Sequence, residues 1–320
     1  MSKPIPALTP IQIDKAQVIA NFPKRPRDSH KGMFGTVAVI GGASGMVGAP
    51  LLAARAALKL GAGCVHVGLL AENAPAVDLL QPELMLHRVH DALQQVIDPD
   101  HNFKDSVIPA QAGIQLNKST GFPPSRERQN TVLAIGCGMG RDMAAQKLLY
   151  DALNIDAALI LDADALNILA QRPDLRTLML SRKNATVITP HPGEAARLLG
   201  CEIKEVQEDR IAAVQQLAHK FGCSVVLKGA NSLCITRNGK LFINQTGNPG
   251  MSAAGMGDVL TGMIAAFIAQ GMPADDALLL AVHLHGAAGD ALAEQQATIG
   301  MTATEVTEWA RWLLNQWQLQ

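Results

Sequence analysis

The sequence has few aromatic residues and almost no net charge. Phe, Trp and Tyr make up only 3% of its 320 residues, and 27 Lys and Arg against 28 Asp and Glu leave a formal net charge of −1. Proteins that bind nucleic acid usually present a basic surface with aromatic side chains for base stacking. We therefore expect no nucleic-acid partner, and the balanced charge also gives no attraction to an anionic membrane.

Paired cysteines and long apolar runs are absent too. The five cysteines lie far apart and none belongs to a Cys-x-x-Cys pair, so neither a disulfide framework nor a zinc site is indicated. The N-terminus has no basic segment followed by an apolar one. The longest apolar stretch, residues 259–271, is too short to cross a bilayer and predicts a buried helix. We expect a reduced, cytoplasmic protein that does not interact with a membrane.

Two common nucleotide-binding motifs are also missing. No Gly-x-x-x-x-Gly-Lys-Ser/Thr sequence is present, which excludes a P-loop. The segment GGASGMVG at 41–48 does not match Gly-x-Gly-x-x-Gly, and no acidic residue ends a second strand at the spacing that dinucleotide binding requires. These absences disfavour a hydride-transferring enzyme of the Rossmann type.

The sequence does contain a regular alternation of strands and helices. Short runs rich in Val, Ile and Leu occur at 36–40 and 64–70 and at the start of 132–140, 158–167 and 185–194, and they are separated by helical segments such as the alanine-rich 50–63. Residues 224–236 are expected to contain two strands around a turn. Apolar strands that alternate with helices are typical of parallel sheets covered on both faces. We therefore predict a single α/β domain, a doubly wound and mostly parallel sheet with helices on both faces. It spans residues 25–320 and follows an N-terminal arm, residues 1–24.

One segment does not fit this alternation. Residues 98–130 contain four prolines, many polar residues and little apolar periodicity. A loop of this length is unusual inside a compact domain. Because the segment lies outside every glycine-rich motif, we expect it to be an exposed, mobile insertion.

Glycine-rich and polar motifs follow the predicted strands. In an open parallel sheet, ligands bind at the carboxyl ends of the strands, so motifs at these ends are expected to converge on one cleft. The motifs are GGASGMVG (41–48), GCGMG (136–140), DADALN (162–167), TPHPGE (189–194), KGANS (228–232) and GMGD (255–258).

The last of these motifs carries the most specific chemistry. In AAGMGDVLTG (253–262), small residues precede a predicted helix whose first amides are free to bind an anion. Asp258 lies at the start of this helix, where one interpretation is an ordinary N-cap. The alternative is a general base, next to an anion site, that deprotonates a hydroxyl attacking a phosphoryl group.

Other ionisable residues allow two interpretations each. Asp162 and Asp164 share a face if the chain is extended there and could hold Mg²⁺, or they could cap a helix. Glu194 is a second candidate for binding Mg²⁺ or organising water. His283 and His285 are two apart on a predicted helix, so they diverge and are not expected to form a metal pair.

Taken together, these motifs resemble a known family. GDVLTG (257–262), preceded by NPGMSAAGM (248–256), resembles the closing motif of the ribokinase-like superfamily. Within that superfamily, residues 25–63 together with LDADALN (161–167), TPHPGE and KGANS resemble the ADP-dependent NAD(P)H-hydrate dehydratases. The resemblance extends over most of residues 25–315 apart from 98–130.

This resemblance implies a repair reaction. The S-forms of NADH hydrate and NADPH hydrate would be dehydrated to NADH and NADPH, with ADP as co-substrate, Mg²⁺ as cofactor, and AMP and phosphate as products. It also implies a homotetramer. Since the chain leaves no room for a fused epimerase domain, we expect a separate epimerase chain as functional partner.

The resemblance further implies roles for individual residues. Asp258 would be the catalytic base and would contact the hydrated coenzyme, together with Ala49, Gly138 and His191. The nucleotide would bind Lys228, Gly229, Ala230, Asn231, Ser232 and Gly257. Ala254 stands where the family usually has glycine, and its methyl group could crowd the phosphates.

Two alternatives remain open at this point. One is a kinase of the same fold that phosphorylates a small alcohol with ATP and releases a stable phosphate ester. The other is a nucleotide-binding regulator without turnover, for which Ala254 is the only support and against which the retained Asp258 argues.

Overall fold

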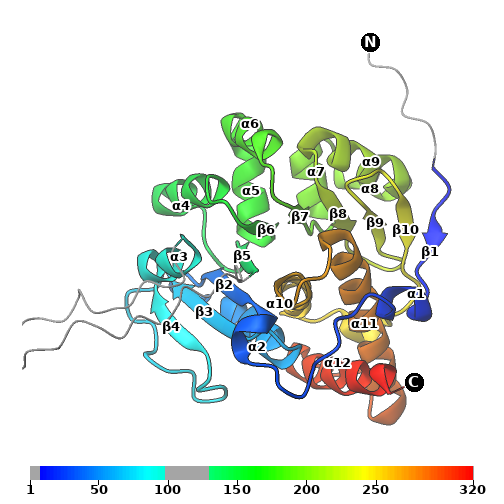
Figure 1. Cartoon of the computed structure of the whole chain (residues 1–320). Coiled ribbons are helices and arrows are strands. Elements are labelled where there is room, and N and C mark those ends of the chain that lie inside the picture. Colours follow the sequence, from blue (N-terminus) through cyan, green and yellow to red (C-terminus); the bar gives the residue numbers. More distant parts are fainter. Residues whose placement is uncertain (1–7, 98–129, 320) are drawn as a thin grey trace, which may run out of the picture.

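The computed structural model describes residues 8–97 and 130–319, which form one ten-stranded sheet covered by helices (Figure 1). The order of the strands across the sheet is β1-β10-β9-β8-β7-β6-β5-β2-β3-β4. Their bounds are β1 (Ile11–Gln12), β2 (Thr36–Gly41), β3 (Cys64–Leu69), β4 (Met85–Arg88), β5 (Thr131–Ile135), β6 (Ala158–Leu161), β7 (Thr186–Ile188), β8 (Ser224–Leu227), β9 (Leu233–Ile235) and β10 (Leu241–Ile243).

The sheet is parallel from β4 to β8. Strand β9 runs antiparallel to both β8 and β10, and β1 pairs with β10 in parallel at the edge. Strand β2 lies between β3 and β5, so the chain winds outward from the middle of the sheet in both directions. The predicted doubly wound, mostly parallel α/β sheet is confirmed, as is the prediction that residues 224–236 contain two strands around a turn.

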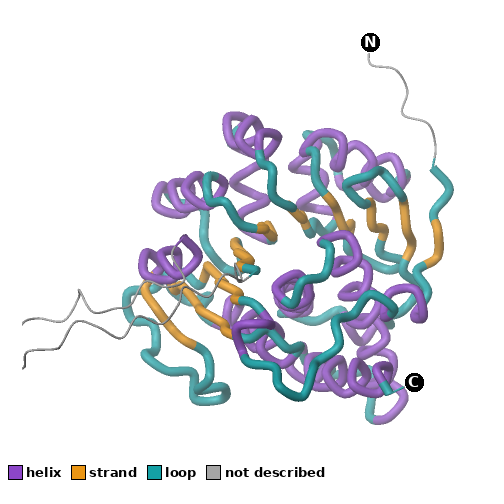
Figure 2. The backbone as a smooth tube through the Cα atoms, viewed as in Figure 1, coloured by secondary structure: helices purple, strands orange, loops and turns teal. Residues whose placement is uncertain are grey.

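Helices cover both faces of this sheet, as Figures 1 and 2 show. One layer packs in a core with β5, β6 and β8, and the other packs on the opposite face. The first layer consists of α3 (Val89–Ile97), α4 (Met143–Leu153), α5 (Ala163–Gln171), α6 (Pro173–Ser181), α7 (Pro192–Leu199), α8 (Ile203–Glu208) and α9 (Arg210–Phe221). The second consists of α1 (Lys15–Ile19), α2 (Gly48–Lys59), α10 (Met256–Ala269), α11 (Ala274–Gln295) and α12 (Ala303–Gln318), and two 3₁₀ helices are η1 (Lys31–Phe34) and η3 (Pro249–Met251).

Helix α10 is the most buried helix of the second layer. Every side chain from Val259 to Ala269 is buried, because the helix lies between the sheet, α2 and α11. A helix that is apolar on all sides needs such an environment. The predicted buried helix is confirmed, and its N-terminus lies near the carboxyl ends of the central strands.

Residues near the N-terminus are part of the same packing. Ile13 and Val18 are buried, and Phe22 packs edge-to-face on Phe267 of α10 with ring centroids 5.6 Å apart. The boundary between arm and domain at residues 24 and 25 stays a prediction. The predicted insertion at 98–130 lies outside the described residues, apart from Asn130.

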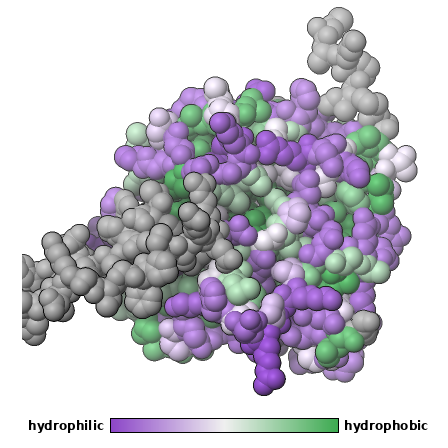
Figure 3. Space-filling view, viewed as in Figure 1, coloured by the Kyte–Doolittle hydropathy of each residue, from purple (hydrophilic) through white to green (hydrophobic). Residues whose placement is uncertain are grey.

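Within residues 8–97 and 130–319, no helix is both long enough and apolar enough to cross a bilayer. Hydrophilic residues cover much of the face in Figure 3, and hydrophobic residues appear there in small groups.

The close packing of α10 on α2 depends on a glycine. A Cβ atom at Gly262 would lie 2.0 Å from the carbonyl oxygen of Ala53, so the helices would have to separate to admit it. We predict that Gly262→Ala lowers the free energy of unfolding by about 2 kcal/mol, since overpacking outweighs the better helix propensity of alanine.

Chemical denaturation would measure this effect, with Gly48→Ala as the control. Gly48 begins α2, and a Cβ atom there would meet no atom within 4 Å. This control should be neutral or slightly stabilising. Equal unfolding free energies for the two variants would show that the contact at Gly262 does not limit the packing.

Candidate active site

Five polar side chains from different elements come together at the carboxyl ends of the central strands. Cys137 follows β5, Asp162 follows β6 and Lys228 follows β8. Glu194 lies in the first turn of α7, after β7, and Asp258 lies in the first turn of α10. The sheet topology therefore brings together residues that are far apart in the sequence, such as Cys137 and Asp258, which are separated by 121 positions.

An ion pair between Lys228 and Asp162 lies at the centre of this group. The Lys228 Nζ atom is 2.8 Å from Asp162 Oδ1, and the side chains are 19% and 2% exposed. Asp162 also accepts hydrogen bonds from the Ala163 amide at 2.9 Å and from the Thr261 hydroxyl at 2.9 Å. Because Thr261 belongs to α10, the pair connects two strand ends to the helix that carries Asp258.

The two partners keep each other charged. Burial alone would raise the pKa of Asp162, but the Lys228 ammonium and hydrogen bonds from Lys228, Thr189 and Thr261 lower it below its usual value. Burial would likewise lower the pKa of Lys228, but the carboxylates of Asp162 and Glu194 raise it. The ammonium group of Lys228, paired with the Asp162 carboxylate, therefore lies beside the cavity.

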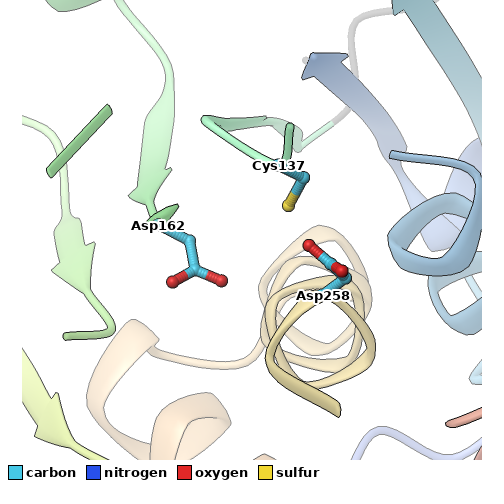
Figure 4. Close-up of side chains that lie close together, drawn as sticks. All are labelled: Cys137, Asp162 and Asp258. Atoms are coloured by element: carbon cyan, nitrogen blue, oxygen red, sulfur yellow. The ribbon is translucent and has the colours of Figure 1, made fainter. Parts of the chain in front are cut away.

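In contrast to Asp162, the carboxyl groups of Asp258 and Glu194 have raised pKa values. Burial, followed by the charge of Asp162, raises the pKa of Asp258 to about 6, although a hydrogen bond with the Cys137 thiol lowers it. Burial also raises the pKa of Glu194 to about 7. Figure 4 shows the side chains of Cys137, Asp162 and Asp258 gathered over the start of α10. A carboxylate that titrates near neutral pH is suited to general base chemistry.

The start of α10 contradicts the interpretation of Asp258 as an N-cap. The N-cap is Gly255, in a left-handed conformation with φ +86°, so Asp258 is the third residue of the helix and not its N-cap. Glycine reaches this conformation without the steric cost of a Cβ atom. No side chain of the described residues caps this helix, so its first amides are free to bind an anion.

The absence of a side chain at Gly257 leaves space above the Lys228–Asp162 ion pair. A Cβ atom there would lie 3.2 Å from Lys228 Nζ and 3.7 Å from Asp162 Oδ2, and a longer side chain would fill the space above the ion pair. Ala254, just before the helix, is exposed, and the consequence of its methyl group for a ligand stays a prediction.

A cavity of about 470 Å³ opens beside this cluster. It lies between the loop after β8, the loop between β10 and α10, and helix α11. All six residues predicted to bind the nucleotide line it: Lys228, Gly229, Ala230, Asn231, Ser232 and Gly257. Asn244, Thr246, Asn248, His285 and other residues of the opposite walls complete the lining.

An arginine that is not among the predicted site residues holds the loop at 228–232 in shape. The guanidinium of Arg210, at the start of α9, donates hydrogen bonds to the carbonyl oxygens of Leu227, Lys228 and Ala230. Gly229 and Asn231 have φ of +131° and +54°, conformations that glycine and asparagine tolerate best. No sequence signal identifies Arg210, because its acceptors are carbonyls of a distant loop.

The residues predicted to contact the hydrated coenzyme lie outside that cavity. Ala49 and Gly138 are neighbours, since a Cβ atom at Gly138 would lie 3.3 Å from the Ala49 Cβ atom and 2.8 Å from Met46. His191 caps α7 by accepting hydrogen bonds from the amides of Gly193 and Glu194 at Nδ1. Their predicted role in binding the coenzyme stays a prediction.

The cluster is a poor fit for Mg²⁺ bound by protein alone. Ligand atoms of Cys137, Asp162 and Asp258 lie within 4.8 Å of one another, but Mg²⁺ prefers oxygen ligands and one of these is a thiol. The oxygens of Asp162 already accept hydrogen bonds, and the Lys228 ammonium lies beside them. Glu194 fits better, because its Oε1 atom lies 3.4 Å from His191 Nε2 and has no closer partner among the described residues.

Asp164 does not share a face with Asp162. Helix α5 begins at Ala163, so the chain is not extended there, and Asp164 instead accepts a hydrogen bond from the Gly140 amide at 2.9 Å. The interpretation of Asp162 as a helix cap is confirmed. His283 and His285 have different neighbours on α11, with His283 next to Asn244 and Trp317.

The buried ion pair should contribute strongly to stability. We predict that Lys228→Met lowers the free energy of unfolding by about 3 kcal/mol, because Asp162 would remain buried with its charge uncompensated. Urea denaturation would measure the effect. Lys147→Met is the matched control, since Lys147 pairs with Asp151 while 75% exposed, and should cost less than about 0.5 kcal/mol. Similar losses in both variants would contradict the central role of the pair.

Comparison with known proteins identifies the family of this chain. The model of the NAD(P)H-hydrate dehydratase family matches residues 37–311. A protein of Neisseria meningitidis serogroup B named ADP-dependent (S)-NAD(P)H-hydrate dehydratase is 40% identical over 299 residues, which are 92% of this chain and 90% of that protein. Other relatives, each named a bifunctional NAD(P)H-hydrate repair enzyme, are longer, and the chain spans about half of their length.

Solved structures show the same fold. The ADP/ATP-dependent NAD(P)H-hydrate dehydratase of Bacillus subtilis, co-crystallised with ATP and Mg²⁺, superposes with a TM-score of 0.77 at 28% identity over 96% of this chain and 98% of that one. A ribokinase-like superfamily protein of Enterococcus faecalis gives 0.76 at 27% identity over 96% and 95%. The fold is therefore ribokinase-like, and the chain belongs to the NAD(P)H-hydrate dehydratase family.

Proposed function

We propose that this protein is an ADP-dependent dehydratase that converts the S-forms of NADH hydrate and NADPH hydrate to NADH and NADPH, with release of AMP and phosphate. Family membership supports the reaction. The observation that carries it in the structure is Asp258, a carboxylate whose pKa is about 6, in the first turn of an uncapped helix and close to the Lys228–Asp162 pair.

The first chemical step is phosphoryl transfer. Asp258 accepts the proton of the ring hydroxyl, and the hydroxyl oxygen forms a bond to the terminal phosphorus of ADP. The bond from that phosphorus to the bridging oxygen breaks, and AMP leaves. The first amides of α10 and the Lys228 ammonium stabilise the charge that builds on the transferring group.

The second step is elimination. The lone pair of the ring nitrogen expels phosphate from the carbon that carried the hydroxyl, and loss of a proton from the neighbouring carbon restores the double bond. Phosphorylation makes this possible because phosphate is a far better leaving group than hydroxide. A site built for phosphoryl transfer can thus produce the outcome of a lyase.

We further propose where each ligand binds. The nucleotide occupies the cavity lined by residues 228–232 and Gly257, and the hydrated coenzyme reaches Asp258 from the side of Ala49, Gly138 and His191. Mg²⁺ would enter with the nucleotide and supply positive charge to offset that of the phosphates, and Glu194 would be the better of the two predicted protein ligands and Asp162 the weaker. A cytoplasmic location, a homotetramer and a separate epimerase chain remain predictions that follow from the resemblance.

The decisive experiment follows the absorbance of the reduced nicotinamide. We predict that incubating the protein with S-form NADPH hydrate, ADP and Mg²⁺ restores this absorbance, with one AMP and one phosphate released for each coenzyme repaired. R-form hydrate is the substrate control. A stable phosphate ester without return of absorbance would instead identify a kinase, and binding of ADP without any product would identify a regulator.

The pH dependence of the rate tests the role of Asp258. The base acts when ionised, so we predict that kcat falls as the pH is lowered through about 6, the pKa of this carboxyl. Asp258→Asn should lower kcat by about 10²–10⁴-fold while ADP affinity changes little, because only the proton acceptor is lost. Asp151→Asn, on the surface of α4, is the matched control. Near-normal turnover in Asp258→Asn would rule out the assignment.

A further inference from the structure

A buried ring nitrogen in the cavity has no partner. Among the described residues, only Arg210 Nε and His285 Nε2 are buried side-chain nitrogen or oxygen atoms without a hydrogen bond. The other nitrogens of Arg210 bind three carbonyl oxygens, and Arg210 is not part of the cavity lining. His285, on α11, does line the cavity. Since buried polar atoms are nearly always hydrogen-bonded, an orphan in a ligand cavity indicates a partner on the ligand.

The hydrogen bond made by the other ring nitrogen, Nδ1, decides whether Nε2 can donate or accept. The His285 ring forms a hydrogen bond with the backbone of Met256, and this bond raises the pKa of the ring. A bond that raises the pKa stabilises the N–H of the ring, so the backbone group is the carbonyl oxygen and not the amide. Because Nε2 has no partner, Nδ1 makes this bond. A carbonyl only accepts, so Nδ1 carries the hydrogen. In the neutral ring, Nε2 then has a lone pair and can only accept.

The surroundings keep the ring neutral. Burial, and then the nearby charge of Lys228, lowers the pKa of His285 to about 4. The partner of Nε2 must therefore be a hydrogen-bond donor on the ligand. The phosphates of ADP carry no such donor at neutral pH, which leaves the ribose hydroxyls and the amino group of the base.

The position of His285 favours the ribose. Its ring contacts Met256, the first residue of α10, directly before Gly257, and it lies near Lys228. These neighbours belong to the end of the cavity that we assign to the phosphates, and the ribose is the part of a nucleotide next to its phosphates. Building on the proposed function, we infer that His285 Nε2 accepts a hydrogen bond from a ribose hydroxyl of ADP and thereby selects ribonucleotides.

Two nearly isosteric substitutions test this inference. In His285→Gln the side-chain amide can still supply an oxygen acceptor, whereas in His285→Met a side chain of similar length cannot. Calorimetric titration would give the Kd of ADP, 2′-deoxy-ADP, 3′-deoxy-ADP and inosine diphosphate for each protein. We predict that His285→Met weakens ADP binding about tenfold, as expected for one hydrogen bond, and that His285→Gln stays within about threefold of wild type.

The analogues complete a double-mutant cycle. One deoxy analogue should bind the wild type about tenfold more weakly than ADP and lose nothing further in His285→Met, because the same bond is already absent. His219→Met, on the exposed surface of α9, is the matched control and should bind ADP as the wild type does. The wild-type comparison needs no variant, so it holds even if a substitution at 285 prevents folding.

The outcomes that overturn the inference are distinct. Unchanged ADP affinity in His285→Met, or equal affinity of the wild type for ADP and both deoxy analogues, would exclude the ribose contact. If the wild type binds inosine diphosphate more weakly than ADP but binds both deoxy analogues as tightly as ADP, the partner of Nε2 lies on the base. A wild-type protein that binds no ADP would overturn both this inference and the proposed function, whereas ADP binding that is indifferent to residue 285 overturns only the former.

Discussion

The buried ion pair between Lys228 and Asp162 is the interaction on which the site depends. It joins the ends of β8 and β6, and through the Thr261 hydroxyl it extends to the helix that carries Asp258. Breaking such a pair leaves a charge without compensation in a medium that solvates it poorly. The residues that would bind the nucleotide and the residue that would act as base are therefore held in register by one network.

The same pair separates the carboxylates into two chemical states. Asp162 stays ionised because Lys228 lies against it, and its charge then helps to raise the pKa of Asp258. Environments that push neighbouring pKa values apart commonly distinguish structural from reacting carboxylates. Asp162 is thus a positioning residue, whereas Asp258 can exchange a proton near neutral pH.

Much of this architecture could be predicted from the sequence, because it depends on local patterns. Runs of Val, Ile and Leu predicted the parallel strands, and residues 259–271 predicted the buried helix α10. The six residues predicted to bind the nucleotide lie in one cavity because strand ends converge at one edge of the sheet.

What could not be predicted depends on backbone details or on distant contacts. Helix α5 begins directly after Asp162, with Ala163 at φ +49°, so Asp164 turns toward Gly140 instead of sharing a face with Asp162. The left-handed Gly255 starts α10 earlier than an N-cap at Asp258 would. Cys137 and Arg210 act on residues far away in the sequence, and neither has a local motif.

The polar cluster at the strand ends does not by itself distinguish a kinase from a dehydratase. A base, a cation and free helix amides suffice for phosphoryl transfer in both, and the elimination is driven by the substrate's own ring nitrogen. Under the proposed function, the residues predicted to contact the hydrated coenzyme, Ala49, Gly138 and His191, would therefore decide which reaction follows.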